Sequence, residues 1–270
     1  MLHNMMIDRN SGSIAVDVTG SGPLVVCVPG MGESKASFRH LTPLLVNAGY
    51  RVAVMDLRGH GDSSTEFSTY DDSAAASDII ELIDALEGAP ATIIGNSMGA
   101  AAAVLVAAQR PEIVNRLVLI GPFLRDHSSQ LVQLLMRAAL SKPWGPWVWR
   151  SYYRSLFGQT VPPDHDEHTR STLELLRHPG RWKAFQKTSQ TSHSHAEASL
   201  PKVSAPTLVI MGEVDRDFKD PESEAKWAAE TLHGEYRMML GAGHYPMGEQ
   251  PKAVFTHLLP FLRRDENKQI

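Results

Sequence analysis

The chain has 270 residues, 43% hydrophobic and 21% charged, and this balance excludes intrinsic disorder over most of its length. Its net charge of −4 gives no reason to expect a nucleic-acid partner. Its single cysteine, Cys27, excludes an internal disulfide. No apolar run approaches the roughly 20 residues that span a bilayer, and residues 1–10 lack a signal-peptide core. We therefore expect a cytoplasmic protein with no membrane partner; nothing in the sequence indicates an oligomeric state.

Apolar runs of strand length recur along the chain, and most of them end beside a glycine, a proline or an aspartate. They cover residues 14–19, 24–28, 51–55, 92–94, 117–120, 208–211 and 236–240. Segments with a helical pattern separate them, at residues 34–47, 71–86, 97–110, 222–232 and 251–263. Runs that are apolar on both faces are typical of strands in a buried parallel sheet. The alternation predicts an α/β fold with a doubly wound, mostly parallel sheet.

Residues 123–200 interrupt this alternation, because they contain no strand pattern. They are divided by several prolines into short stretches of helical character. We interpret this segment as a helical cap, or lid, inserted into a core formed by residues 1–122 and 201–270. Ten Lys/Arg and six Asp/Glu give the segment a charge of +4, whereas the rest of the chain carries −8.

The pentapeptide Gly95-Asn96-Ser97-Met98-Gly99 follows one apolar run and opens a helical segment. This context is what the G-x-S-x-G nucleophile elbow requires, in which a tight turn lifts the serine hydroxyl above the carboxyl edge of the sheet. The glycines are needed because neighbouring side chains would prevent the turn. The pattern predicts Ser97 as a nucleophile.

A serine hydroxyl is a weak nucleophile and needs a base. Among the 12 histidines, His244 is the best placed, because it lies in a glycine-containing loop just after the last apolar run. The base needs an acid that fixes its tautomer, and an acidic cluster follows the run at 208–211. We favour Asp215, three residues after Gly212, and keep Asp217 as the alternative.

Attack on a carbonyl creates an oxyanion that must be met by hydrogen-bond donors already in place. We expect the backbone amides of Met98, directly after the nucleophile, and of Met31, in the glycine-containing loop at residues 28–32, to serve as these donors.

No metal site or cofactor is predicted. The segment Asp56-Leu57-Arg58-Gly59-His60-Gly61-Asp62-Ser63 lacks the Lys-Ser/Thr pair of a phosphate-binding loop. Metal binding by Asp56, His60 and Asp62 is an alternative that we consider weaker than a hydrogen-bonded loop. The pair His193 and His195 lacks a third placed ligand and is also weak evidence for a metal.

Six aromatic residues crowd residues 144–157 of the predicted cap. They can pack the cap onto the core, or they can close an apolar pocket for substrate. We expect Trp144, Trp147 and Tyr152, together with Tyr245 beside the predicted base, to line that pocket.

With these motifs in place, the chain resembles the α/β-hydrolase fold superfamily, in which the order serine, acid, histidine recurs. The runs at residues 56–63 and 241–246 are similar to recurring family segments. The members that it most resembles are small cofactor-free carboxylesterases and lactonases. The resemblance implies Ser97 as nucleophile, Asp215 as acid and His244 as base, with the oxyanion held at Met31 and Met98.

The sequence departs from relatives at two places. Pro29 stands where many members have a histidine before the oxyanion loop, and Tyr245 stands where many C–C bond hydrolases have a tryptophan. We expect a serine hydrolase that cleaves carboxylic esters or lactones of small to medium apolar substrates through an acyl-enzyme on Ser97. The alternatives are a C–C bond hydrolase or perhydrolase with the same triad, and a ligand-binding homologue without catalysis.

Overall fold

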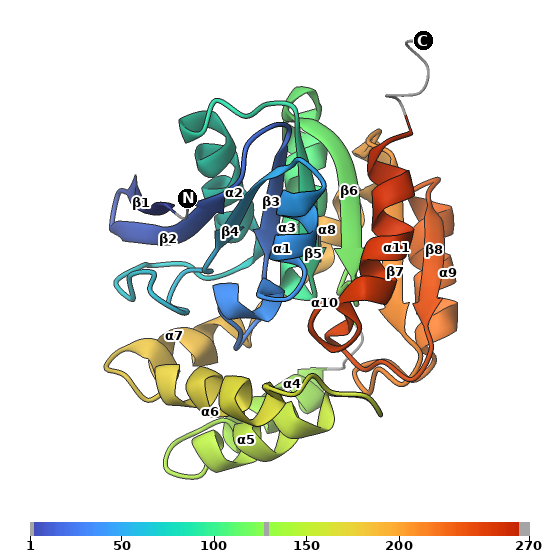
Figure 1. The fold of residues 1–270 in the computed structure, drawn as a ribbon. Helices are drawn as coiled ribbons and strands as arrows, with labels where there is room; N and C mark the ends of the chain where they lie inside the picture. Colours follow the sequence, from blue (N-terminus) through green and yellow to red (C-terminus); the bar gives the residue numbers. More distant parts are fainter. Residues whose placement is uncertain (1–2, 127–129, 265–270) are drawn as a thin grey trace.

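A computed structural model describes residues 3–126 and 130–264 (Figure 1). Its centre is an eight-stranded sheet with the strand order β1-β2-β4-β3-β5-β6-β7-β8. The strands are β1 (His3–Arg9), β2 (Gly12–Thr19), β3 (Leu24–Val28), β4 (Arg51–Met55), β5 (Ala91–Asn96), β6 (Val114–Ile120), β7 (Thr207–Gly212) and β8 (Glu235–Met239). Strands β3 to β8 run parallel to one another, and the antiparallel pairs are β1 with β2 and β2 with β4. The mostly parallel sheet expected from the sequence is confirmed.

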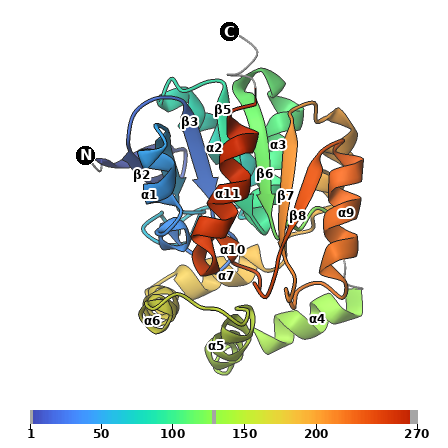
Figure 2. The ribbon, with the colours of Figure 1, turned by 45° about the vertical axis from the view of Figure 1, so that its right-hand side comes forward.

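Helices cover both faces of this sheet (Figure 2). They are η1 (Lys35–Phe38), α1 (Thr42–Asn47), α2 (Asp72–Ala85), α3 (Met98–Gln109), η2 (Pro111–Ile113), α9 (Pro221–Thr231), α10 (Pro246–Glu249) and α11 (Pro251–Leu262). Along β3, Val26 and Val28 face an apolar cluster with α2, α3 and α9, whereas Val25 and Cys27 face a second cluster with α1 and α11. Because both faces of the strand are buried, it reads as a continuous apolar run.

Two local expectations are corrected. Strand β1 was not anticipated, because it lies at the sheet edge and only Ile7 among its side chains is buried, so it lacks an apolar run. The helix expected over residues 34–47 is divided into η1 and α1. Helix α1 begins beside Pro43, whose ring supplies no amide hydrogen and suits a helix start rather than a helix interior.

The segment between β6 and β7 contains helices joined by loops, with no strand among its described residues. They are α4 (Gln130–Ala139), α5 (Gly145–Ser155), α6 (His165–Leu175), α7 (Arg181–Thr188), α8 (Ser194–Ser199) and η3 (Leu200–Lys202). Helices α4 to α7 lie past the carboxyl ends of the parallel strands (Figure 1), whereas α8 packs against α2 and α3. The division into core and cap at residues 123 and 200 stays a prediction. Within the described residues, no helix has the length and apolar character needed to cross a bilayer.

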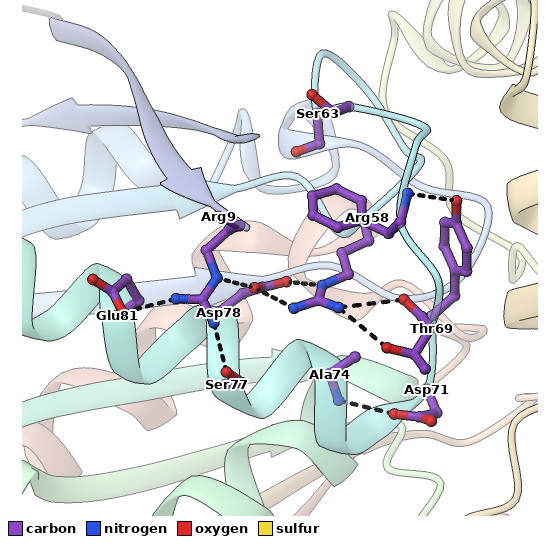
Figure 3. Close-up of polar contacts among 12 residues, drawn as sticks. Arg9, Arg58, Ser63, Thr69, Asp71, Ala74, Ser77, Asp78 and Glu81 are labelled. Atoms are coloured by element: carbon purple, nitrogen blue, oxygen red, sulfur yellow. Dashed lines mark hydrogen bonds and ion pairs between the residues drawn. The ribbon is translucent and has the colours of Figure 1, made fainter. Parts of the chain in front are cut away.

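A buried carboxylate ties the edge of the sheet to α2 (Figure 3). Asp78 is paired with Arg9 of β1, at 2.9 Å from Nε, and with Arg58, at 2.6 Å from Nε. Arg58 also donates to Thr69, so it fixes the loop that follows β4. The hydrogen-bonded loop considered for residues 56–63 is therefore present, with its arginine anchored on α2.

Replacing Asp78 with alanine should lower the free energy of unfolding by about 3–5 kcal/mol, because two largely buried guanidinium groups would lose their shared partner. Urea denaturation measures this change. The matched control is Glu81→Ala, which removes the half-exposed partner of Arg9 and should cost less than about 1 kcal/mol. Equal effects of the two substitutions would contradict this assignment.

Candidate active site

Ser97 occupies a strained turn between β5 and α3. Its backbone has φ 55° and ψ −120°, a conformation that residues with side chains seldom adopt. A Cβ at Gly95 would collide with the backbone of Gly99, and a Cβ at Gly99 would collide with the Val28 carbonyl. The strand–turn–helix context predicted for the pentapeptide is present, and both of its glycines are sterically required.

His244 and two carboxylates meet beyond the ends of β7 and β8. The His244 Nδ1 atom lies 2.7 Å from Asp215 Oδ2 and 3.5 Å from Asp217 Oδ2. Asp215 also accepts the backbone amide of Asp217 at 3.0 Å. Of the two acids left open by the sequence, Asp215 makes the shorter contact, and Asp217 lies close enough to act on the same ring electrostatically.

Burial and neighbouring charges shift the pKa of His244 in opposite directions. Burial alone would lower the pKa of its imidazole, but the negative charges of Asp215 and Asp217 outweigh burial and raise the pKa to about 9. For Asp217, burial raises the pKa of the carboxyl group. The imidazolium form of His244 is therefore stabilised, which is the form that a general base takes after it has accepted a proton.

Gly121 and Asn96, for which the sequence predicted no role, also support this arrangement. Gly121 follows β6 with φ 51°, and a Cβ there would lie 3.1 Å from His244 Nδ1 and 3.3 Å from Asp215 Oδ2. The Asn96 side chain donates to the backbone oxygens of Ile120 and His244, at 3.0 and 3.2 Å. Gly121 precedes a proline at the end of an apolar run, and this turn signal could have indicated it.

The loop that carries Met31 lies directly against the serine turn. A Cβ at Gly30 would lie 2.8 Å from the Cβ of Ser97, so only glycine permits this approach. Met31 and Met98, the two predicted oxyanion donors, line the same cavity as Ser97 and His244. The structure therefore brings together all five residues that the sequence proposed for the chemistry.

A buried polar cluster joins this loop to the inserted helices. The carboxylate of Glu33 accepts the hydroxyl of Tyr153 from α5, and its Oε2 lies 3.4 Å from Nε2 of His168 in α6. All three side chains are buried. Glu33 follows Met31 by two residues, so the cluster anchors this loop on α5 and α6.

A cavity of about 460 Å³ lies above Ser97. Tyr152 and Tyr245 line it, as expected, and Tyr152 donates to the carboxylate of Asp217. Trp144 and Trp147 are not among its described lining residues. Their side chains are 54% and 73% exposed on the outer surface, so this part of the pocket prediction is corrected.

Trp149 takes the place of these two tryptophans in the cavity wall. It lies on the buried face of α5 with Tyr153 and Leu156, and Trp147 lies on the opposite face. Aromatic crowding alone could not separate the two faces. The other described lining residues are Phe123, Arg125, Asp126, Val132, Gln133, Met136, Arg137, Leu156, Thr188, Ser189, Gln190, Thr191, His193 and Asp217.

Asp215, Asp217 and His244 also form the one cluster, in the part of the chain described, whose donor atoms lie close enough together to hold a metal ion. However, ligands on a tetrahedral zinc ion lie about 3.3 Å apart. The 2.7 Å between His244 Nδ1 and Asp215 Oδ2 is shorter than this and fits a hydrogen bond.

The other metal alternatives raised by the sequence have different partners. Asp56 accepts the backbone amides of Lys35 and Asp62, at 2.7 and 2.8 Å, so its oxygens stabilise the loop. His193 Nδ1 lies 2.8 Å from Asp72 Oδ2 at the start of α2, and His195 Nδ1 lies 3.4 Å from a serine hydroxyl there.

Glu249 of α10 joins the histidine loop to the end of α5. Its buried carboxylate accepts the backbone amides of Gly158, Gly243 and Tyr245, at 2.7–3.2 Å. The His244 amide in turn donates to the Leu156 carbonyl at 2.7 Å. Gly158 and Gly243 permit this close backbone contact, because a Cβ on either one would collide with the other segment.

Replacing Glu249 with alanine should lower the free energy of unfolding by about 3 kcal/mol, because three backbone amides would lose their acceptor in a buried place. Denaturant unfolding followed by circular dichroism measures the change. The control is Glu230→Ala, an exposed carboxylate on α9, for which we expect a change within about 0.5 kcal/mol. A similarly small change for Glu249→Ala would rule out the anchoring role.

Comparison with known proteins agrees with this geometry. The sequence profile of the alpha/beta hydrolase family matches residues 25–257, and the chain belongs to this family. It is 27% identical over 268 residues to a pyrrolizixenacetamide deacetylase from Xenorhabdus hominickii, covering 92% of this chain and 94% of that protein. The resemblance drawn from the sequence motifs is thereby confirmed.

Solved structures support the same fold. A bromoperoxidase from Bacillus anthracis superposes with a TM-score of 0.83 at 21% identity, covering 97% of this chain and 100% of that chain. A thermophilic esterase from Thermogutta terrifontis superposes with a TM-score of 0.82 at 22% identity, covering 97% and 98%. At these identities the likeness shows the fold, and the chemistry must be argued from the site.

Proposed function

We propose that the chain is a serine hydrolase that cleaves carboxylic esters or lactones of small to medium apolar substrates. The observation that carries the proposal is the 2.7 Å contact between His244 Nδ1 and Asp215 in a cavity that Ser97 also lines. A buried imidazole paired with a carboxylate is the base that a serine nucleophile requires. Membership of the alpha/beta hydrolase family supports hydrolysis as the class of reaction.

In the proposed mechanism, the Ser97 hydroxyl oxygen attacks the substrate carbonyl carbon while His244 Nε2 accepts the hydroxyl proton. The amides of Met31 and Met98 donate hydrogen bonds to the oxyanion. His244 then gives the proton to the leaving alcohol oxygen, and an ester bond to Ser97 remains. Water repeats these steps on the acyl-enzyme and releases the carboxylic acid. We further propose that α4 to α7 act as the lid, through those of their side chains that line the cavity.

The cavity wall favours an apolar group beside the reacting carbonyl. Met31, Trp149, Leu156 and Tyr245 contribute apolar surface, whereas the polar lining residues come chiefly from the chain after β6 and the end of α7. About 460 Å³ suits a substrate of small to medium size.

The dependence of hydrolysis on pH should follow the raised pKa of His244. Because only the neutral imidazole can accept the serine proton, kcat/KM should fall as pH decreases below about 9. The Asp217→Asn substitution removes one of the negative charges that raise this pKa, so the acidic limb should move to lower pH. Initial rates with an aryl acetate from pH 5 to 10 measure both profiles. A limb that stays in place or moves upward in the variant would contradict the role given to Asp217.

A substrate panel tests the proposed function. Purified protein should hydrolyse aryl esters or lactones without an added cofactor. Vinylogous diketones test the C–C bond alternative, and acetate with hydrogen peroxide tests perhydrolysis, which the similarity to a bromoperoxidase structure also makes worth measuring. If the protein turned over diketones or formed peracid but did not hydrolyse esters or lactones, the proposed substrate class would be wrong.

A further inference from the structure

Helix α4 exposes its apolar face to solvent. The residues of α4 that line the cavity are Val132, Gln133, Met136 and Arg137, so two of the helix's three polar residues face inward. Leu131, Leu134 and Leu135 do not line the cavity and are 66%, 60% and 60% exposed. Positions i, i+3 and i+4 share one face of a helix, so the leucines form a continuous apolar stripe. A surface helix of a globular protein normally turns its leucines inward.

Two tryptophans extend this stripe onto the next helix. Trp144, which precedes α5, is 54% exposed and donates its indole hydrogen to the Ala138 carbonyl of α4 at 3.0 Å. Trp147, on the first turn of α5, is 73% exposed. Of the twelve large apolar side chains exposed in the described part of the chain, nine fall between residues 131 and 161. We call the set Leu131, Leu134, Leu135, Trp144 and Trp147 the apolar rim. Its helices lie at one end of the molecule (Figure 2).

The chain segment that carries the apolar rim has charges of one sign. Residues 130–163 contain no Asp or Glu, and they contain four basic residues, Arg137, Lys142, Arg150 and Arg154, all of them exposed. The chain as a whole carries −4, so this segment differs in sign from the rest. A contact between two copies of the rim would oppose like charges, whereas an anionic surface would attract Lys142, Arg150 and Arg154; Arg137 faces the cavity.

We propose that the apolar rim docks on the surface of an anionic phospholipid bilayer. The leucines and tryptophans would enter the headgroup region, where tryptophan is favoured, and the basic side chains would meet lipid phosphates. Because Val132 and Met136 of the same helix line the cavity, docking places the cavity wall against the lipid. The sequence predicted no membrane partner from the lack of a spanning run, but a helix lying on the surface needs none.

Vesicle sedimentation of the full chain tests this proposal. We expect binding to vesicles of phosphatidylcholine and phosphatidylglycerol that is at least tenfold stronger than to phosphatidylcholine alone and that weakens with added salt. The triple variant Leu131→Gln, Leu134→Gln, Leu135→Gln should bind at least tenfold more weakly, while glutamine keeps the helix propensity. The control Met6→Gln, at an exposed site on β1, should bind as the unsubstituted protein does.

A second variant separates charge from apolar contact. Replacing Arg150 and Arg154 with glutamine should weaken binding to anionic vesicles about fivefold for each charge and leave binding to neutral vesicles unchanged. Neither residue lines the cavity, and neither do the three leucines. Hydrolysis of a soluble ester by these variants should therefore equal that of the unsubstituted protein. This readout separates failure of docking from failure of the proposed hydrolase activity, on which docking does not depend.

Three outcomes would overturn the proposal. The first is no sedimentation of the unsubstituted protein with anionic vesicles at low salt. The second is equal sedimentation of the protein and the leucine variant. The third is light scattering that shows a dimer for the protein and a monomer for the leucine variant, which would mean that a second copy covers the apolar rim.

Discussion

Replacing Ser97 with alanine should lower kcat for an aryl ester by roughly 10⁴–10⁶-fold and leave the fold intact. Without the hydroxyl oxygen, no acyl-enzyme can form, and the residual rate comes from the oxyanion donors and substrate binding alone. The strained backbone at φ 55° already accommodates a Cβ in serine, so alanine adds no new steric demand. Steady-state kinetics with matched circular dichroism spectra measure both parts of this prediction.

The control for this substitution is Ser223→Ala. Ser223 is an exposed serine near the start of α9, where it donates to Asp220, and its loss should leave kcat within twofold. If Ser97→Ala retained half of the activity, Ser97 would not be the nucleophile.

The second large effect is expected at the acid. Asp215→Asn should lower kcat by roughly 10³–10⁴-fold, because an asparagine amide facing His244 Nδ1 favours the tautomer that cannot accept the serine proton. The geometry around the ring should survive, because asparagine has nearly the shape of aspartate. Kinetics over a range of pH show whether the loss lies in kcat at every pH, as the tautomer argument requires.

The neighbouring acid provides the matched comparison. Asp217 Oδ2 lies 3.5 Å from His244 Nδ1, beyond hydrogen-bond distance, so Asp217→Asn should cost less than about tenfold in kcat. If instead Asp217→Asn cost more than Asp215→Asn, the acid would be Asp217, the alternative that the sequence left open.

The turn at Ser97 and the buried strands could be predicted because each depends on a short run of consecutive residues. The apolar run, the two glycines and the helix after Ser97 specify one turn, and that turn is present. The buried strands were found within a few residues of their bounds because both faces are apolar, whereas β1, at the sheet edge, has no such signal. The mostly parallel sheet then brings the ends of its strands, and the loops that hold His244 and Asp215, to one edge.

Contacts between segments far apart in the chain could not be predicted, because they give no local pattern in the sequence. Glu249 reaches Gly158 across 91 residues, and Glu33 reaches Tyr153 across 120, so neither pair could be recognised from local composition. Which face of α5 is buried depends on how the helix packs against the rest of the protein. Sequence spacing groups Trp149 with Tyr153, but it does not say which group faces the cavity and which, like Trp147, faces solvent.

Covalent labelling with a fluorophosphonate tests the central claim most directly. The probe phosphonylates a serine only where a base and an oxyanion site activate it, so it reports the assembled site without knowledge of the substrate. We expect intact-mass measurement of the folded protein to show one adduct, located on Ser97 by peptide mapping and abolished in Ser97→Ala. No adduct on the folded protein, or an adduct on another residue that persists in Ser97→Ala, would contradict a serine hydrolase centred on Ser97.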